Sequence, residues 1–255
     1  MKEIRATALK NFDIRPLTKK GQICARETIL PLKPYLEPMT HKIEQVSRFV
    51  HDYLIKSGKD HLDETWGPKY RWEHTLRVSH WAHQLADEAK ADVESCVISA
   101  LFHDVSHFTS EEYRKHGIKS AEIARNYLEK KDFSQEFIEK VAYAIKSHVG
   151  EFHPITIEAK ILQDADTLDR FGFVRILLFG KKAELTDLKK LKEQVQSFLN
   201  YLRKAEKGDF GRMWTKTGED ELAKLVKINM AICSGVLKEL EDTKALEKSL
   251  KRHRQ

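Results

Sequence analysis

The chain has 255 residues, of which 41% are hydrophobic and 33% charged, with only 11 glycines and 6 prolines. This is the composition of a soluble globular protein, and the abundance of Lys, Glu, Leu and Ala favours helices. The net charge of +6 favours anionic ligands only weakly, because 45 basic residues are interspersed with 39 acidic ones. Nucleic-acid binding therefore stays open but is not favoured.

Three cysteines without a Cys-X-X-Cys pair exclude a disulfide framework and a thiolate zinc site. The first ten residues lack the apolar core of a signal peptide. No apolar run approaches the ~20 residues that a membrane span needs, and Arg175 interrupts the most apolar stretch. We therefore expect a cytoplasmic protein that does not associate with a membrane.

Residues 1–40 hold four of the six prolines, which predicts an irregular arm packed on the body of the protein. After a Thr40 N-cap, apolar residues recur at the spacing of helices, and Asp92 and Ser134 are predicted to cap two of them. The predicted helices cover about 41–54, 70–90, 92–105, 117–130, 134–148, 156–170, 184–206 and 218–247. Residues 41–180 are predicted to form the catalytic core, and residues 181–255 a C-terminal helical extension of the same domain. Gly150 is predicted to end the fifth helix.

Several ionisable residues continue the apolar faces of these helices. His74 lies four residues before Val78 on the same face, and Asp104 follows Leu101 by three positions. His103, His148 and Asp166 share this inward placement, and buried polar groups are costly unless they are paired or bound to a metal. Imidazoles with carboxylates suit Mn, Fe, Co, Ni or Zn better than Mg or Ca, although Mg stays open.

Four motifs carry a resemblance to a known family. They are HisThrLeuArgVal from His74, AlaLeuPheHisAspVal around His103, HisGlyIleLysSerAla from His116, and AspAlaAspThrLeuAspArgPheGly from Asp164. In this order they resemble the HD-domain superfamily of metal-dependent phosphohydrolases, over roughly residues 70–170. The resemblance implies an all-α fold, a helical bundle with one metal held by His74, His103, Asp104 and Asp166. Asp164 is the alternative to Asp166.

The resemblance also implies roles in binding and turnover. It places Arg71 near the substrate phosphate and aims His116 at the scissile phosphate. In binuclear relatives, histidines near positions 116 and 148 bind a second metal, so the number of metals stays open. Asp104 is predicted to be both ligand and proton acceptor. His116, or with less support His148, would protonate the leaving oxygen or stabilise the phosphoryl charge.

One position departs from the family pattern. Thr167 follows the ligand aspartate, where many relatives have a Lys or Arg that contacts phosphate, and this counts against a triphosphate substrate. Arg170, Arg77 or Lys146 could take over that contact. His107, one turn beyond Asp104, is the remaining candidate for substrate binding.

The predicted function is hydrolysis of a small phosphate ester by a metal-activated water. The substrate class is a nucleotide, a cyclic phosphate or another phosphomonoester. One alternative is an HD-fold di-iron oxygenase, which needs both His116 and His148 as ligands. Another is an HD-type nuclease, which the positive charge favours slightly. A homo-oligomer formed through the long C-terminal helices also stays open.

Overall fold

The computed structural model describes residues 41–62, 64, 66–110, 112, 115–149, 153–175, 187–209 and 213–252. Within these ranges the regular structure is helical and no residue lies in a strand, so the predicted all-α class is confirmed. The arm predicted over residues 1–40, the Thr40 cap and the helix end at Gly150 lie outside the described residues.

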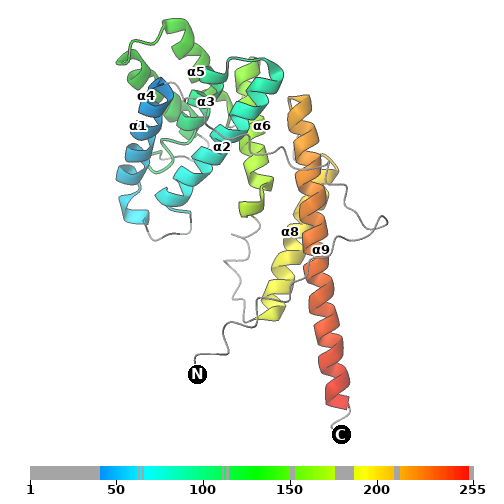
Figure 1. Cartoon of the computed structure of the whole chain (residues 1–255). Helices are drawn as coiled ribbons and strands as arrows, with labels where there is room; N and C mark the ends of the chain where they lie inside the picture. Colours follow the sequence, from blue (N-terminus) through cyan, green and yellow to red (C-terminus); the bar gives the residue numbers. More distant parts are fainter. Residues whose placement is uncertain are drawn as a thin grey trace, which may run out of the picture. The chain divides into compact units, whose positions relative to one another are not determined.

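The described helices follow the predicted order along the chain (Figure 1). They are α1 (His41–Ser57), the short 3₁₀ turn η1 (Lys59–His61), α2 (Pro68–Ala89), α3 (Val93–Phe102), α4 (His116–Glu129), α5 (Gln135–Ser147), α6 (Ile157–Phe171), α8 (Leu188–Glu206) and α9 (Lys216–Arg252). Two predicted caps are confirmed. Asp92 accepts a hydrogen bond from the backbone of Ser95 at 3.2 Å, and Ser134 accepts one from Phe137 at 3.3 Å.

Helix α3 is buried on all sides and lies between two hydrophobic clusters. Cys96 and Ala100 belong to a cluster shared with α2, α5, α6, α8 and α9, whereas Ile98 and Phe102 belong to a second one shared with α1, α4 and α5. A helix that is apolar around its whole circumference is stable only when it is enclosed in this way. The packing therefore fixes the C-terminal end of α3, where the His103–Asp104 doublet follows.

The third helix ends at Phe102, earlier than the predicted end near residue 105. Nδ1 of His103 donates to the carbonyl of Ala100 at 2.7 Å, and the amide of Val105 donates to the carbonyl of Phe102 at 3.0 Å. These bonds satisfy carbonyl groups that a helix leaves without partners at its C-terminus and tighten the last turn. The doublet thus projects from the end of a buried helix rather than from its side.

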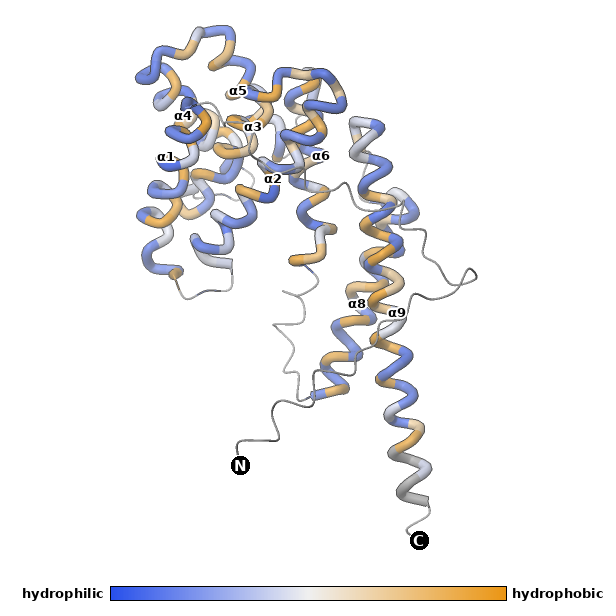
Figure 2. Tube along the Cα trace, in the orientation of Figure 1, coloured by the Kyte–Doolittle hydropathy of each residue, from blue (hydrophilic) through white to orange (hydrophobic). Residues whose placement is uncertain are grey.

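Helices α8 and α9 pack against each other, and α9 also contacts α6 (Figure 1). Apolar residues of α8 (Phe198, Leu199 and Leu202) join the same cluster as Leu225 and Val226 of α9. Apolar and polar residues alternate along both helices, as expected for amphipathic helices (Figure 2). Among the described helices, none is both long enough and apolar enough to cross a membrane.

Candidate metal centre

Four predicted ligands meet where α2, α3 and α6 converge, and all four side chains are buried. Nε2 of His74 lies 3.1 Å from Nε2 of His103, 3.5 Å from Oδ2 of Asp104 and 3.5 Å from Oδ1 of Asp166. Donor atoms that bind one metal ion at about 2.1 Å are about 3.0–3.4 Å apart in octahedral or tetrahedral arrangements. The donor atoms of His74, His103 and Asp104 therefore lie close enough together to share one ion, and Oδ1 of Asp166 lies next to His74. We call this group the first position.

A second group of donor atoms uses the other oxygen of the same aspartate. Oδ1 of Asp104 lies 2.9 Å from Nε2 of His116 and 3.6 Å from Nε2 of His148. The two histidine nitrogens are 3.2 Å apart, and both side chains are buried. These three atoms form the second position. Asp104 therefore presents one oxygen to each position, which is the geometry of a bridging carboxylate.

Hydrogen bonds to Nδ1 orient three of the imidazoles. His103 contacts the carbonyl of Ala100 at 2.7 Å, His148 contacts the carbonyl of Ile145 at 2.6 Å, and His74 contacts Oδ2 of Asp169 at 2.7 Å. An acceptor at Nδ1 requires a proton there, so in a neutral ring the lone pair is on Nε2. Metal-binding histidines are oriented by bonds of this type.

The charges around His74 favour a cation at the first position. Burial would lower the pKa of His74, but hydrogen bonds to Asp104 and Asp169 and the charge of Asp166 raise it to about 9. The imidazole therefore carries a second proton at neutral pH, and Nε2 donates it toward His103. The two carboxylates that favour this second proton, each 3.5 Å from Nε2, would equally favour a metal ion that replaces it. The donor set thus fits the predicted metal.

Arg71 and His107 flank Asp104 from the side of α2. Nη1 of Arg71 donates to Oδ2 of Asp104 at 2.5 Å, and Nη2 lies 3.2 Å from Nε2 of His107. Burial and the charge of Arg71 lower the pKa of His107 to about 4, so this imidazole is neutral and accepts from the guanidinium. Burial would raise the pKa of Asp104, but His103 and Arg71 keep it well below its usual range. Asp104 is therefore ionised.

The other predicted substrate-binding residues lie at different places around the centre. Arg170 pairs with Oδ2 of Asp166, and about half of its side chain is exposed (52%). Thr167 is partly buried next to Asp166, and Lys146 is exposed on α5, two residues before His148. Arg170 is thus joined to a candidate ligand, whereas the roles of Thr167 and Lys146 stay predictions.

Asp164, the alternative ligand, is directed elsewhere. Its carboxylate accepts hydrogen bonds from the backbone of Trp214 at 2.9 Å and from the backbone and hydroxyl of Thr215, both at 2.7 Å. These residues precede α9, so Asp164 anchors the start of that helix to α6. Asp166 instead has its Oδ1 3.5 Å from Nε2 of His74, so it is the carboxylate of α6 that faces the first position.

Asp169 is a functional residue that was not predicted from the sequence. This residue lies three positions after Asp166 and therefore on the same face of α6, inside a motif that was already recognised. Both of its oxygens are used, one by His74 and the other by Arg77, whose Nε lies 2.5 Å from Oδ1. Arg77, one of three residues that could contact phosphate in place of Thr167, pairs with this carboxylate.

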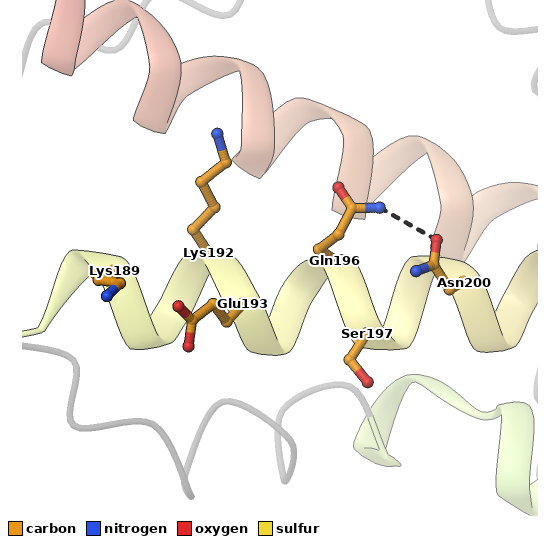
Figure 3. Close-up of a pocket in the computed structure, with 6 residues that line it drawn as sticks. All are labelled: Lys189, Lys192, Glu193, Gln196, Ser197 and Asn200. Carbon is orange, nitrogen blue, oxygen red and sulfur yellow. Dashed lines mark hydrogen bonds between the residues drawn. The ribbon is translucent and has the colours of Figure 1, made fainter.

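A hollow of about 560 Å³ lies along α8, away from these residues (Figure 3). Lys192 extends toward α9, where it pairs with Glu241 at 2.9 Å, while Glu193 and Ser197 point to the opposite side. The described lining residues are Lys189, Lys192, Glu193, Gln196, Ser197 and Asn200. They contribute no donor atom to either position.

Residues 71–170 match the family model of the HD domain, and this range includes all the donor atoms of both positions. The chain therefore contains an HD domain over these residues. Over 97 residues this HD protein is 34% identical to Ribonuclease Y of Acidothermus cellulolyticus, a match that covers 38% of this chain and 18% of that protein. The chain thus spans only about a fifth of the length of the curated relatives it matches.

Solved structures of HD proteins agree with this fold. An HD superfamily hydrolase from an uncultured Thermotogales bacterium is 26% identical, with a TM-score of 0.53, and the match covers 75% of this chain and 91% of that one. An HD-superfamily hydrolase from Bacillus thuringiensis is 22% identical, with a TM-score of 0.56, covering 78% and 97%. The similarity to the Bacillus thuringiensis structure supports the fold alone.

Proposed function

We propose that this HD protein is a metal-dependent phosphohydrolase that cleaves a small phosphate ester. The observation that carries the proposal is the position of Asp104, with Oδ2 toward His74 and His103 and Oδ1 toward His116 and His148. Divalent ions held in such a site lower the pKa of a coordinated water and polarise a phosphoryl oxygen. The donor set of imidazoles and carboxylates suits Mn, Fe, Co, Ni or Zn.

The proposed ligands divide between two ions. His74, His103, Asp104 and Asp166 would hold the first, and Asp104, His116 and His148 the second. In a centre with a single ion, His116 would instead face the substrate and protonate its leaving oxygen, as the sequence suggested. The short distance between His116 and His148, 3.2 Å between Nε2 atoms, favours the two-ion arrangement.

Arg71 is the best-placed group to bind the substrate phosphate. Its Nη1 and Nη2 atoms contact Asp104 and His107, so the guanidinium lies at the edge of the centre. Its Nε is buried and has no hydrogen-bond partner among the described residues. A buried donor without a partner costs free energy that a phosphate oxygen would recover. Arg170, on the exposed side of Asp166, is positioned to supply a second cationic contact.

A substrate panel tests this function. Purified protein loaded separately with Mn, Co, Ni, Fe or Mg would be incubated with nucleoside mono-, di- and triphosphates, cyclic nucleotides and other phosphomonoesters, and phosphate release measured. We expect metal-dependent hydrolysis of one class, and loss of turnover together with the first ion in His103→Ala. Full turnover in a His103→Ala protein that retains its metal would contradict the proposal.

A nuclease is the second candidate, because the sequence of the HD domain is similar to that of Ribonuclease Y and the chain carries a net charge of +6. Cleavage of end-labelled single-stranded RNA or DNA by the Mn-loaded protein, without hydrolysis of mononucleotides, would favour it. The di-iron oxygenase alternative requires His116 and His148 to bind metal together. Oxygen consumption by iron-loaded protein with a polyol or phosphonate would favour that alternative.

A further inference from the structure

Asp169 lies directly behind His74, on the side away from the proposed ions. Its Oδ2 is 2.7 Å from Nδ1 of His74, and its side chain is 5% exposed. His103 and His148 have backbone carbonyls at the equivalent atom. Of these three imidazoles, His74 therefore has a full negative charge behind it, which makes its Nε2 a stronger donor to a cation.

Arg77 holds the carboxylate of Asp169 from the opposite side. Its Nε lies 2.5 Å from Oδ1 and its Nη2 lies 3.3 Å from Oδ2, which fixes the plane of the carboxylate. The ring of Tyr70 lies parallel to the ring of His74, within 9° and with centroids 6.3 Å apart. The guanidinium of Arg77 also lies over Tyr70, at 5.7 Å. His74 is thus held by groups behind it and beside it.

We propose that Asp169 is a positioning residue of the metal centre, which keeps the proton of His74 on Nδ1 and aims Nε2 at the first position. Arg77 in turn keeps Asp169 in place. The inference rests on the metal centre of the proposed function and extends it to two residues that contribute no donor atom. Residues that orient a metal-binding histidine in this way change metal affinity by about 10- to 100-fold when they are removed.

Asp164 provides a matched control for a purely structural role. It lies on the same helix, its side chain is buried, and it accepts three hydrogen bonds from Trp214 and Thr215. Replacing either aspartate by asparagine removes a buried charge from α6. Only the change at Asp169 removes a charge that contacts a proposed ligand, His74. We therefore expect both variants to lose stability, but only the Asp169 variant to lose metal affinity.

The experiment compares Asp169→Asn, Asp169→Ala and Asp164→Asn with the wild-type protein. Mn²⁺ binding is measured by calorimetry, and the visible absorption of the Co²⁺-loaded protein reports the ligand geometry. Asp169→Asn should bind the first ion about 10-fold more weakly and Asp169→Ala up to about 100-fold more weakly, because the asparagine oxygen still accepts from Nδ1. The Co²⁺ spectrum should change in both. Asp164→Asn should melt at a lower temperature but keep the wild-type affinity and spectrum.

Unchanged Mn²⁺ affinity in Asp169→Ala, or an equal loss in Asp164→Asn, would overturn the positioning role. Should the Asp169 variants fail to fold, Arg77→Gln decides the question, since Arg77 is partly exposed and its loss frees Asp169. Wild-type affinity in that folded variant would equally overturn the role. Because the titration needs no substrate, a protein that binds Mn²⁺ but hydrolyses no phosphate ester would contradict the proposed function and leave this result valid. A wild-type protein that binds no metal would overturn both.

Discussion

A Cβ atom placed on Gly117 would lie 2.5 Å from Cγ2 of Val149 and 3.2 Å from the carbonyl oxygen of Ile145. Helix α4 therefore begins in direct contact with the end of α5, at a separation that only glycine allows. Because His116 precedes Gly117 and His148 precedes Val149, this contact also brings the two histidines of the second position together. The glycine of the His–Gly motif has a role in the proposed metal centre.

Gly117→Ala should therefore weaken the second position while leaving the first intact. The methyl group must displace Val149 or the backbone at Ile145, at a cost of about 1–3 kcal/mol in the free energy of unfolding. A two-site Mn²⁺ titration should show normal binding of one ion and weaker binding of the other. Gly235→Ala is the control, since nothing lies within 4 Å of that Cβ. It should raise stability by about 0.5–1 kcal/mol. Normal binding of both ions by Gly117→Ala would contradict this account.

The N-cap of α3 stabilises the helix that carries the doublet. Asp92 accepts from the Ser95 amide, and its other oxygen lies 3.1 Å from Nζ of Lys140. Asp92→Ala should lower the free energy of unfolding by about 1 kcal/mol at pH 7, whereas Asp92→Asn should change it little, because asparagine also caps helices. Urea denaturation of both variants checks this. Equal stability of the two variants would argue against a capping role.

The same residue predicts a dependence of stability on pH. Partial burial raises the pKa of Asp92, but the Ser95 amide and Lys140 lower it more, so the folded-state pKa lies below its ordinary value of 3.8. Stabilisation from this group is therefore complete above pH 3.8 and is lost as the pH falls through the folded-state value. As the pH falls below 3.8, the free energy of unfolding of wild type should decrease relative to that of Asp92→Asn. A constant difference in the free energy of unfolding across that range would contradict the lowered pKa of Asp92.

Added metal should stabilise the fold, because the proposed donor atoms come from five separate helices and the turns that follow them. At a free Mn²⁺ concentration about a hundred times its Kd, one bound ion adds about 2.7 kcal/mol to the free energy of unfolding. For a chain of this size, that corresponds to a rise of roughly 5–10 °C in Tm. Differential scanning calorimetry with Mn²⁺ and with EDTA measures it. Asp104→Ala should show no such rise, and a rise equal to wild type would count against the site.

Helix positions and inward faces could be predicted from the sequence, because each depends on residues a few positions apart. The spacing of His74 from Val78 and of Asp104 from Leu101 was enough to place both side chains in the interior, and both are buried. The caps at Asp92 and Ser134 were predicted for the same reason. The predicted end of α3 lies a few residues too late, because the bond from the His103 ring to the carbonyl of Ala100 depends on the conformation of one side chain, which the spacing of apolar residues does not indicate.

Relations between helices could not be predicted in the same way. Asp164 and Asp169 lie in one motif, and nothing local distinguishes the carboxylate that anchors α9 from the one that contacts His74. That distinction depends on which helix packs against each face of α6. Thr215, which contacts Asp164, is 51 residues away in the sequence, and His74, which contacts Asp169, is 95 residues away. The orientation of the Asp104 carboxylate between two pairs of histidines depends on the same packing. The sequence therefore left the number of metals open.

The proposed bridging of two ions by Asp104 is tested most directly by the metal content per chain. Wild type, His148→Ala and Asp104→Ala would be loaded with Mn²⁺, freed of excess metal and measured by elemental analysis, with folding checked by circular dichroism. We predict two ions per wild-type chain, one in His148→Ala and none held firmly in Asp104→Ala. A His148→Ala protein with the same metal content as wild type would contradict the bridging role of Asp104.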